Sequence, residues 1–497
     1  MNLATMIDEH PADDVAMVSR GETTTYGALV DQVARLRGGL ASRGVGPDDR
    51  VGIVCATNWY FVVSYLATLG VGAVAVPLNP ASPAAELEEQ LLEVGASAVV
   101  VGPNGKVAFA GVRRDRLAAL DLVVTTGGGG LDDAVGLEEV MSAEPVPVVD
   151  RADDDLAALI FTSGTAGSPK AAMLTHRNLL SNLEQAQRQP GRSLVSTDVV
   201  YGVLPLFHIF GLNVLLGLTL HVGASVVLEE RFDPASSLDV LLEHGVTTVV
   251  GAPPMWAAWA AMPEVPEGCF EKVRLALSGA ARLPDAVADT CRDRFGLRLS
   301  EGYGLTEASP IVTSSVGDEP RVGSVGRPLP GVEVRLVDTD GQDALEGDSG
   351  EVWVRGPNVF AGYLDDAEAT AAVLDGEGWL HTGDIAVSDD DGYLYLVNRS
   401  KDVIIVSGFN VFPGEVEEVL ASHAGIREVA VVGVPHPHTG EAVKAYVVVE
   451  PGQSFEEDLL IGFCEDRLAR YKCPDKIEFV PQIPRGLGGK VLRRALR

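Results

Sequence analysis

The sequence predicts an α/β fold with more than one domain, and three observations lead to this prediction. At 497 residues the chain is longer than a single hydrophobic core usually extends. Hydrophobic residues make up 46% of it and charged residues 22%, a balance typical of well-packed globular proteins rather than disordered ones. Runs rich in β-branched residues alternate with helix-like segments, so we expect a large N-terminal α/β domain.

The first half of the chain shows this alternation most clearly. An apolar strand is expected at Val51–Cys55, and the twenty residues Trp59–Leu78 carry no charge and are long enough to cross a bilayer. Gly70, Gly72 and Pro77 interrupt this stretch, which therefore predicts a buried helix leading into a buried strand, without membrane insertion. Further strands are expected at Ala98–Val101, Val199–Leu204, Ser225–Leu228, Thr247–Val250 and Val273–Leu277. Helices are expected at Pro83–Glu93, Asn178–Gln187 and Asp285–Phe295.

The pattern changes in the last third of the chain. From Val322 to Val397 short strands separated by Gly and Asp replace the helices, which predicts a β-rich subdomain. After Arg399 strands and helices mix again, with strands expected at Val429–Val434 and Ala442–Glu450. This compact segment predicts a small C-terminal α+β domain.

Charge and cysteine usage exclude several classes of protein. The chain has 38 basic and 70 acidic residues, and its formal charge of −32 opposes binding to nucleic acid and to anionic membranes. The five cysteines, an odd number without metal-ligand spacing, indicate neither a disulfide framework nor a zinc site. The first residues, MNLATMIDEHPADD, are acidic and lack the apolar core of a signal peptide. We therefore expect a cytoplasmic protein.

The segment Phe161–His176, FTSGTAGSPKAAMLTH, has the composition of a phosphate-binding loop. Gly164 and Gly167 let backbone N–H groups turn inward, and Lys170 supplies a mobile positive charge. Hydroxyl donors surround them at Thr162, Ser163, Thr165 and Ser168. The segment is not a Walker loop, because two residues separate its glycines and Pro169 precedes the lysine. Taken alone, it is as consistent with an ordinary flexible turn as with a nucleotide site.

Five further segments follow downstream in a fixed order. They are Pro205–Gly211 (PLFHIFG), Glu301–Ser309 (EGYGLTEAS), Thr382–Asp384 (TGD), Arg399–Glu417 (RSKDVIIVSGFNVFPGEVE) and Pro484–Arg494 (PRGLGGKVLRR). Together with the loop they resemble the signature set of the acyl-adenylate-forming superfamily, which includes acyl-CoA synthetases, firefly luciferase and the adenylation domains of peptide synthetases. The resemblance extends from about Thr25 to Arg497. The loop departs from the family pattern at Ala166 and Ala171, where the family usually has Thr and Gly, so one hydroxyl donor is missing.

The resemblance implies the adenylate-forming enzyme fold, in which a small C-terminal domain moves against a large N-terminal one. It places the AMP-binding domain, with the ATP and acyl pockets, at residues 1–398 and the mobile domain at residues 402–497. Residues 399–401 are the expected hinge, where Lys401 absorbs the backbone rotation. Gly408, Phe409 and Tyr471 are expected to contact CoA.

The implied reaction is the attack of a carboxylate on the α-phosphate of ATP, which expels pyrophosphate. Lys490 matches the family's catalytic lysine, which bridges the acyl carboxylate and the α-phosphate when the domains close; outside this motif it would be a solvated tail residue. Glu307 has the residue type for Mg²⁺, with Thr162 as a second oxygen donor. Tyr303 is expected against adenine, and Asp384 at the ribose hydroxyls.

These roles define two sets of candidate residues. The expected ATP-binding residues are Thr162, Ser163, Gly164, Thr165, Gly167, Lys170, Gly279, Ala280, Ala281, Gly302, Tyr303, Gly304, Thr306, Asp384 and Arg399. The expected catalytic residues are Lys490, Glu307, Lys170 and His208.

The pocket for the acid is expected to be apolar. The resemblance assigns His208 and Phe210 to its wall, and Trp256 and Trp259, three residues apart on an expected helix, are placed to cap it. No lysine or arginine occurs in the segments expected to line it, Pro205–Leu220, Val250–Ala261 and Ser300–Pro310. Because an unpaired buried carboxylate is costly, a dicarboxylate is disfavoured, and a fatty acid is favoured over its principal rival, an aryl acid.

The sequence therefore predicts an ATP-dependent acyl-CoA synthetase for a medium- or long-chain fatty acid, with Mg²⁺ as cofactor and CoA as co-substrate. One alternative is an aryl-acid CoA ligase. Another is an adenylating enzyme that loads a carrier-protein thiol; the lack of a carrier domain after Arg497 speaks against it, although a separate carrier could serve. A catalytically dead binding protein is disfavoured because Lys170, Glu307, Asp384 and Lys490 are all present. A luciferase-like oxidation has no distinguishing feature, and the oligomeric state stays open.

Overall fold

The computed structural model describes most of the chain, which divides into two compact units. Described are residues 1–126, 131–162, 170–191, 193–319, 321–345, 347–399, 404–406, 409–411, 413–436, 440–468, 470–485 and 491–496. The first unit comprises Met1–Glu333 and Val354–Leu380, and the second comprises Val334–Trp353 and His381–Arg497. The predicted domain boundary at residue 398 stays a prediction.

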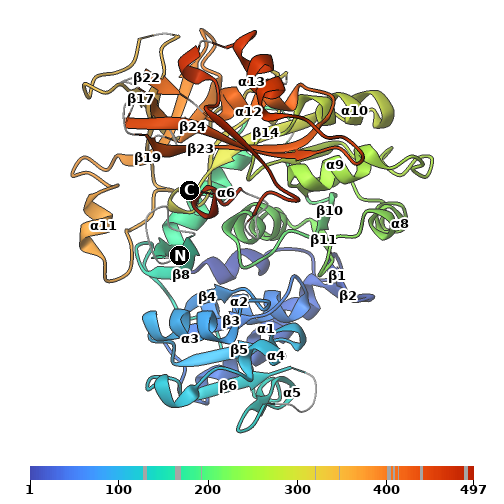
Figure 1. The fold of residues 1–497 in the computed structure, drawn as a ribbon. Helices are drawn as coiled ribbons and strands as arrows, with labels where there is room; N and C mark the ends of the chain where they lie inside the picture. The colour runs from blue at the N-terminus through green and yellow to red at the C-terminus, as the bar shows by residue number, and fades with distance from the viewer. Residues whose placement is uncertain are drawn as a thin grey trace. The chain divides into compact units, whose positions relative to one another are not determined.

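A seven-stranded sheet forms the base of the first unit, in the order β7-β6-β5-β3-β4-β8-β9 (Figure 1). Its strands are β3 (Arg50–Val54), β4 (Val74–Leu78), β5 (Ala98–Val101), β6 (Leu122–Thr125), β7 (Val135–Gly136), β8 (Leu156–Thr162) and β9 (Lys170–Thr175). The helices of this region are α1 (Tyr26–Ala41), α2 (Trp59–Gly70), α3 (Ala84–Glu93), α4 (Lys106–Phe109) and α5 (Leu137–Val140). Strands from β7 to β8 run parallel, and only the β8–β9 pair is antiparallel. Continuous apolar runs such as those of β4 and β5 are buried along their whole length, as parallel sheets require.

The uncharged stretch Trp59–Leu78 folds as expected, because helix α2 is followed by the buried strand β4. The side chain of Asn58 caps α2 by accepting a hydrogen bond from the backbone N–H of Phe61. No helix in the described part of the chain is long and apolar enough to cross a membrane.

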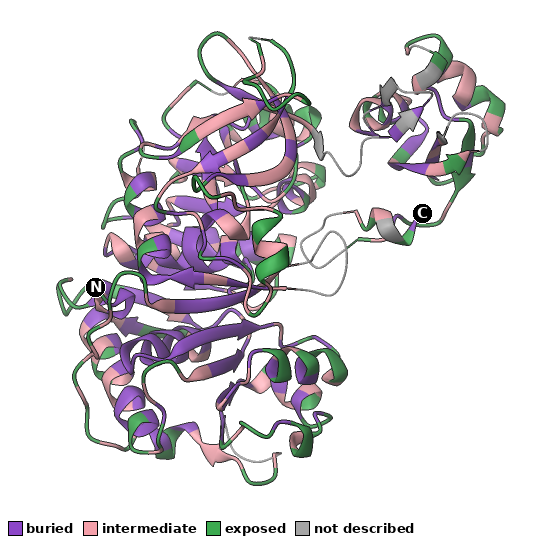
Figure 2. Cartoon of the chain, turned by 90° about the vertical axis from the view of Figure 1, so that its left-hand side faces the viewer, coloured by how far each residue is buried: buried purple, intermediate pink, exposed green. Residues whose placement is uncertain are grey.

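A nine-stranded sheet forms the rest of the first unit, in the order β16-β15-β14-β13-β12-β10-β11-β1-β2. Its strands are β1 (Val15–Ser19), β2 (Glu22–Thr25), β10 (Val199–Gly202), β11 (Ser225–Leu228), β12 (Thr248–Gly251), β13 (Leu275–Ser278), β14 (Leu299–Gly304), β15 (Ile311–Ser314) and β16 (Arg327–Pro328). The helices between them are α6 (His176–Gln187), the π-helix η4 (Phe210–Gly217), α7 (Leu218–His221), α8 (Pro234–His244), α9 (Pro253–Ala261) and α10 (Asp285–Phe295). Most strands of the two large sheets are buried along most of their length (Figure 2). The expected strands and helices of this region all occur, within two residues of their predicted bounds for most of them.

The register of the nine-stranded sheet brings two glycine-containing segments together. Ser278 at the end of β13 pairs with Gly251 on one side and with Glu301 on the other. Because β12, β13 and β14 are parallel, the loop after Ser278 and the EGYG segment of β14 emerge at the same edge of the sheet. This edge is the place where α/β sheets usually bind ligands.

The remaining strands form two smaller sheets. One has the order β17-β18-β19-β20 and the other β22-β21-β24-β23, with β25 beside β24. Their strands are β17 (Glu333–Val337), β18 (Gly350–Arg355), β19 (Leu380–Ser388), β20 (Leu394–Arg399), β21 (Ile404–Val406), β22 (Phe409–Val411), β23 (Ile426–His436), β24 (Gly440–Val449) and β25 (Lys476–Phe479). Helices α12 (Pro413–Ala421) and α13 (Glu457–Glu465) pack on the second of these sheets around Val416, Leu420, Leu460 and Cys464. The expected β-rich region contains one short helix, α11 (Ala367–Ala371), and the C-terminal segment is α+β as predicted.

Short 3₁₀ helices complete the described elements. They are η1 (Leu3–Ile7), η2 (Pro103–Gly105), η3 (Arg114–Arg116), η5 (Thr306–Ala308), η7 (Arg470–Lys472) and η8 (Arg493–Ala495). All five cysteines are buried and free, in agreement with the expectation of no disulfide framework.

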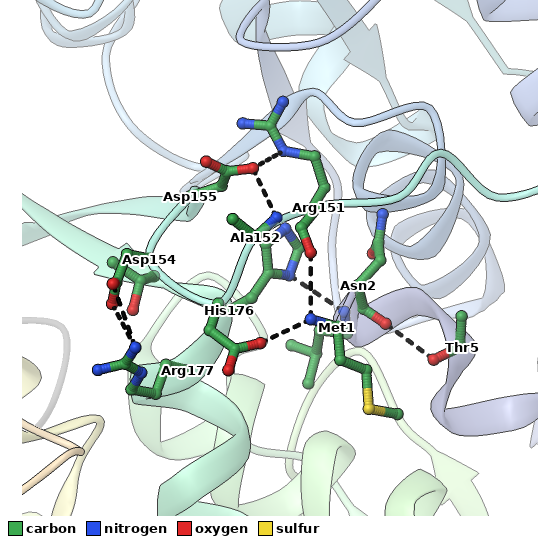
Figure 3. A network of polar contacts seen from close by, with 12 residues as sticks. Met1, Asn2, Thr5, Arg151, Ala152, Asp154, Asp155, His176 and Arg177 are labelled. Atoms are coloured by element: carbon green, nitrogen blue, oxygen red, sulfur yellow. Dashed lines mark hydrogen bonds and ion pairs between the residues drawn. The ribbon is translucent and has the colours of Figure 1, made fainter.

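The first residue of α6, His176, lies in a polar network that joins the chain's first residues to the segment before β8 (Figure 3). Its Nδ1 accepts a hydrogen bond from the backbone N–H of Leu3 at 3.1 Å, and its Nε2 is buried without a partner. Burial, helped by the positive charge of Arg151, lowers the pKa of His176 from the ordinary 6.5 to about 4. The folded state therefore keeps this ring neutral.

We expect this ring to make stability depend on pH. The folded-state pKa lies below the unfolded one, so the contribution is complete above about pH 6.5 and is lost as the pH falls toward 4, by on the order of 3 kcal/mol. The free energy of unfolding, measured with urea at several pH values, should fall more steeply over this range for the parent chain than for His176→Gln, which does not titrate. Equal slopes for the two chains would show that His176 is not the titrating group.

Candidate active site

The two strands that flank the phosphate loop place its ends opposite one another. In the antiparallel pair of β8 and β9, Thr162 faces Lys170, and the Thr162 hydroxyl donates to the backbone carbonyl of Lys170 at 3.4 Å. Four candidate residues of the loop, Ser163, Gly164, Thr165 and Gly167, lie outside the described residues. The described flanks therefore form the base of a hairpin.

Lys170 and Glu307 meet in one cluster of side chains. The Lys170 ammonium makes an ion pair with Asp366, and its Nζ lies 5.7 Å from the ring centre of Tyr363. The Tyr363 hydroxyl in turn donates to Glu307 Oε1 at 2.7 Å. The Lys170 ion pair holds the pKa of Asp366 below its usual value, while burial and the Glu307 charge raise that of Tyr363. Two candidate residues from separate motifs thus share a connected polar site.

The segment Phe360–Asp366 holds this cluster together through its backbone. It runs along β9, where Leu364 N–H donates to the Ala171 carbonyl at 2.9 Å and Met173 N–H donates to the Gly362 carbonyl at 2.9 Å. Phe360 N–H also donates to the carbonyl of Glu307 at 2.9 Å. These bonds tie the segment to both motifs at once.

Sequence reasoning missed Tyr363 and Asp366. Asp366 caps α11 by accepting a hydrogen bond from Ala369 N–H at 2.8 Å, and an Asp before a short run of helix formers is a signal that the sequence does contain. Its pairing with Lys170, 196 residues away, carries no such local signal. The sequence could have indicated the cap, therefore, but not the ion pair.

The edge of the nine-stranded sheet presents the residues expected around adenine. Ala280, in the loop after β13, adopts a φ of +70°, which is rare for a residue with a side chain and keeps this loop in a sharp turn. Gly304 ends β14, and a Cβ there would lie 2.1 Å from the carbonyl oxygen of Pro310, so only glycine fits. Tyr303 is buried between these turns and exposes 9% of its surface. The other expected members, Gly279, Ala281, Gly302 and Thr306, belong to the same two segments.

Glu301 joins the two segments and was not among the predicted site residues. Its carboxylate accepts a hydrogen bond from the Leu283 backbone N–H at 3.3 Å, across the loop that follows β13. Burial raises its pKa to about 7, only partly offset by this bond and by Arg282. The sequence contains a signal for Glu301, because this residue begins the segment EGYGLTE. Only later residues of that segment were predicted as site residues.

Asp384 and Arg399, the expected ribose ligands, lie directly opposite one another in the pairing of β19 with β20. Asp384 is buried, and its backbone N–H donates to the Thr382 hydroxyl at 3.1 Å. The preceding Gly383 N–H donates to Glu351 Oε1 at 2.9 Å. These bonds hold the TGD turn in place on the four-stranded sheet.

Several predicted residues of the second unit lie beyond what the structure describes. Lys401, Gly408 and Lys490 fall outside the described residues, as do the side chains of Arg399, Phe409 and Tyr471. Next to Tyr471, the Lys472 ammonium donates to both carboxylate oxygens of Glu415, at 2.6 and 2.8 Å.

The candidate wall of the acyl pocket divides into two groups. His208 is exposed, and its Nδ1 accepts a hydrogen bond from Phe210 N–H at 3.2 Å. Phe210 packs against the adenine loop, since a Cβ on Gly279 would lie 2.8 Å from its ring. Trp256 and Trp259 are instead fully buried, with ring centres 5.3 Å apart in an edge-on contact.

Both tryptophans are anchored within the core of the domain. Trp256 Nε1 donates to the Leu277 carbonyl at 3.3 Å, and Trp259 Nε1 donates to the Ser237 hydroxyl at 3.0 Å. Trp259 also packs edge-on against Phe232 and Phe270. Their position therefore does not support the expected role as a cap on the pocket.

A cavity of about 60 Å³ lies between the nine-stranded sheet and the helices α6, η4 and α7. Its lining is mostly aliphatic and includes Val200, Val214, Val250, Leu275, Leu277 and Ile311. Among its lining residues, Val214 belongs to η4, which begins at Phe210, and Leu277 belongs to β13, which precedes the loop expected to contact adenine. Neither Trp256 nor Trp259 lines this cavity.

Comparison with known proteins gives matches over nearly the whole chain. Residues 3–364 match the family model described as AMP-binding enzyme, and residues 415–490 match the model of its C-terminal domain. A long-chain-fatty-acid–CoA ligase of Yersinia pestis is 38% identical over 98% of this chain and 92% of its own length. A feruloyl-CoA synthase of Amycolatopsis is 37% identical over 96% of this chain and 94% of its own length.

Solved structures agree with these matches. The ATP-bound structure of MatB from Rhodopseudomonas palustris has a TM-score of 0.91 and 33% identity, and covers 100% of this chain and 98% of its own. The o-succinylbenzoate CoA synthetase of Bacillus subtilis, solved with its acyl-adenylate, has a TM-score of 0.86 and 28% identity, with the same coverage.

Proposed function

Because the chain belongs to the AMP-binding enzyme family, we propose that it is an ATP-dependent acyl-CoA synthetase. It activates a carboxylic acid as the acyl-adenylate, releases pyrophosphate and transfers the acyl group to CoA. The predicted fold, a large α/β domain with a small C-terminal domain, is confirmed by the two domain matches and the solved ligases. The proposal rests above all on the cluster that joins Lys170 to Glu307 through Tyr363 and Asp366.

The cluster suits the phosphate end of ATP. Lys170 supplies a positive charge to the leaving phosphates, and the two glycine-containing segments at the edge of the nine-stranded sheet supply backbone groups around the base. Tyr303 lies against adenine, Asp384 and Arg399 bind the ribose, and Lys490 bridges the acid and the α-phosphate. These residues orient ATP and the carboxylate of the acid, the two anions that must come together in the reaction.

Glu307 is the residue that fits Mg²⁺. Proteins hold this ion through one or two carboxylates together with substrate phosphates and water, and Glu307 is a half-buried carboxylate oriented by Tyr363. Among the described residues no group of three or more His, Cys, Asp or Glu is placed to hold a metal, which suits an ion that arrives with the nucleotide. When bound, Mg²⁺ neutralises negative charge on the phosphates. Thr162, at the start of the loop, is the second proposed donor.

The aliphatic cavity supports a fatty acid as the substrate. We place the tail of the acid here because the cavity lies under the same nine-stranded sheet at whose edge the expected nucleotide segments emerge, and its lining offers no cation for a second carboxylate. The long-chain ligase of Yersinia pestis supports the same choice. An aryl acid is the second candidate, because the relatives include a feruloyl-CoA synthase and the aromatic ring of Phe210 lies against Gly279 in the loop after β13.

We expect activity to rise steeply with the length of the acid. Each added methylene contributes about 0.8 kcal/mol on burial, or about fourfold in affinity, until the pocket is full. Pyrophosphate release should be measured across a series of fatty acids, with benzoate, ferulate and malonate included. A maximum at acetate or malonate would refute the apolar pocket, and a maximum at an aryl acid would refute only the fatty-acid choice.

The cavity itself can be tested with Val250→Phe, which fills it from the end of β12. The preferred chain length should become shorter, while activity with acetate, whose short tail does not reach the cavity, serves as the internal control. An unchanged chain-length profile would place the tail elsewhere.

The acceptor of the second half-reaction can be identified by offering CoA and a phosphopantetheinyl carrier protein separately and measuring thioester formation with each.

A further inference from the structure

Lys170, the lysine proposed to contact the phosphates of ATP, makes an ion pair within the protein. Its ammonium pairs with the Asp366 carboxylate, and both side chains are 36% exposed. Glu93, at the end of α3, also interacts with this charge. The proposed phosphate-binding lysine thus has a carboxylate of the protein as its partner.

Asp366 is held more firmly than the lysine it contacts. Its Oδ1 accepts the N-cap hydrogen bond from Ala369, and its backbone carbonyl accepts from the Thr370 hydroxyl at 2.8 Å. Lys170, by contrast, has a flexible four-carbon side chain that carries its charge to different partners. When phosphate arrives, the lysine is therefore the partner that moves.

We propose that Asp366 is a built-in competitor of the leaving phosphates of ATP for Lys170. This inference rests on the proposed function, which assigns Lys170 to those phosphates. ATP must displace the carboxylate in order to bind, and the same carboxylate displaces pyrophosphate when it leaves. Asp366 thereby sets the affinity for ATP and pyrophosphate but not for AMP, which lacks the phosphates that Lys170 contacts.

The chain offers a closely matched pair of variants. Asp366→Asn removes the charge but keeps the cap of α11, because Asn caps helices as well as Asp does. The control is Asp365→Asn, which removes the same charge one residue earlier, at an exposed position with a φ of +52° that Asn tolerates. The difference between the two variants isolates the ion pair from the loss of a nearby negative charge.

Dissociation constants of ATP, pyrophosphate and AMP should be measured by calorimetry at one ionic strength, without acid or CoA. For Asp366→Asn we expect ATP and pyrophosphate to bind about two- to fivefold tighter, which is the range that an exposed ion pair allows. AMP should bind as it does to the parent chain, and Asp365→Asn should leave all three constants unchanged. Weaker ATP binding to Asp366→Asn, or an equal gain in both variants, would overturn the proposal.

A double-mutant cycle gives an independent check. In a Lys170→Ala background, Asp366→Asn should no longer change the affinity for pyrophosphate, because the ammonium group for which Asp366 and pyrophosphate compete is absent. A persisting effect would show that Asp366 acts through another group. These dissociation constants do not depend on product formation. If the protein proves not to be a CoA ligase, they therefore still test whether Asp366 competes with phosphate for Lys170.

Discussion

Lys490→Ala should slow formation of the acyl-adenylate by about a hundred- to a thousandfold. The family resemblance gives this residue the bridge between the acyl carboxylate and the α-phosphate, and removing one preorganised charge from a transition state costs about 3–4 kcal/mol. Thioester formation from supplied acyl-adenylate should continue at nearly the parent rate, because the resemblance assigns the lysine to the adenylation step. Both half-reactions are measured separately, by pyrophosphate release and by thioester formation.

The control for this variant is Arg485→Ala, which removes a positive charge five residues earlier in the same motif. Arg485 pairs with Glu428 at 3.0 Å, and both side chains are partly exposed, so its loss should have little effect on either step. If Lys490→Ala slowed both half-reactions equally, the lysine would have a structural role instead.

The second large effect is expected for Lys401→Pro. Proline fixes φ near −65° and removes the backbone donor, so it should hold the hinge that the family resemblance implies at Lys401 in a single orientation. Thioester formation should be lost while adenylation persists. Lys401→Ala keeps a rotatable backbone and should retain both steps. Full CoA ligase activity in the proline variant would exclude Lys401 as the hinge.

Neither of these two residues lies in the described part of the chain, so both expectations rest on the motifs. The motifs were reliable where the structure and the comparisons test them, because a set of short segments in a fixed order is specific even when each is common alone. The phosphate loop and the five segments downstream of it together predicted the family, the two-domain fold and the acyl-CoA ligase class. Local patterns also predicted elements such as β5 and α10 with the correct bounds.

The sequence did not indicate which distant segments of the chain contact one another. Phe360–Asp366 had no recognised motif, yet its hydrogen bonds to β9 and to Glu307 bring Tyr363 and Asp366 to the candidate site. Contacts between residues so far apart in the sequence depend on the tertiary fold, and local sequence patterns carry little information about it.

The two tryptophans are a second case in which the sequence pattern did not decide where a side chain packs. Their spacing correctly predicted one face of a helix, α9, but a helical face can pack on a core as well as on a pocket. Only the positions of Leu277, Ser237 and the neighbouring phenylalanines decide that both rings are buried in the core. By itself, then, the sequence determined the family and the fold class, because these follow from short motifs in a fixed order and from the local alternation of strands and helices. The tertiary structure alone decided which side chains meet Lys170 and which residues line the cavity, because burial and long-range pairing arise only when the sheets are assembled.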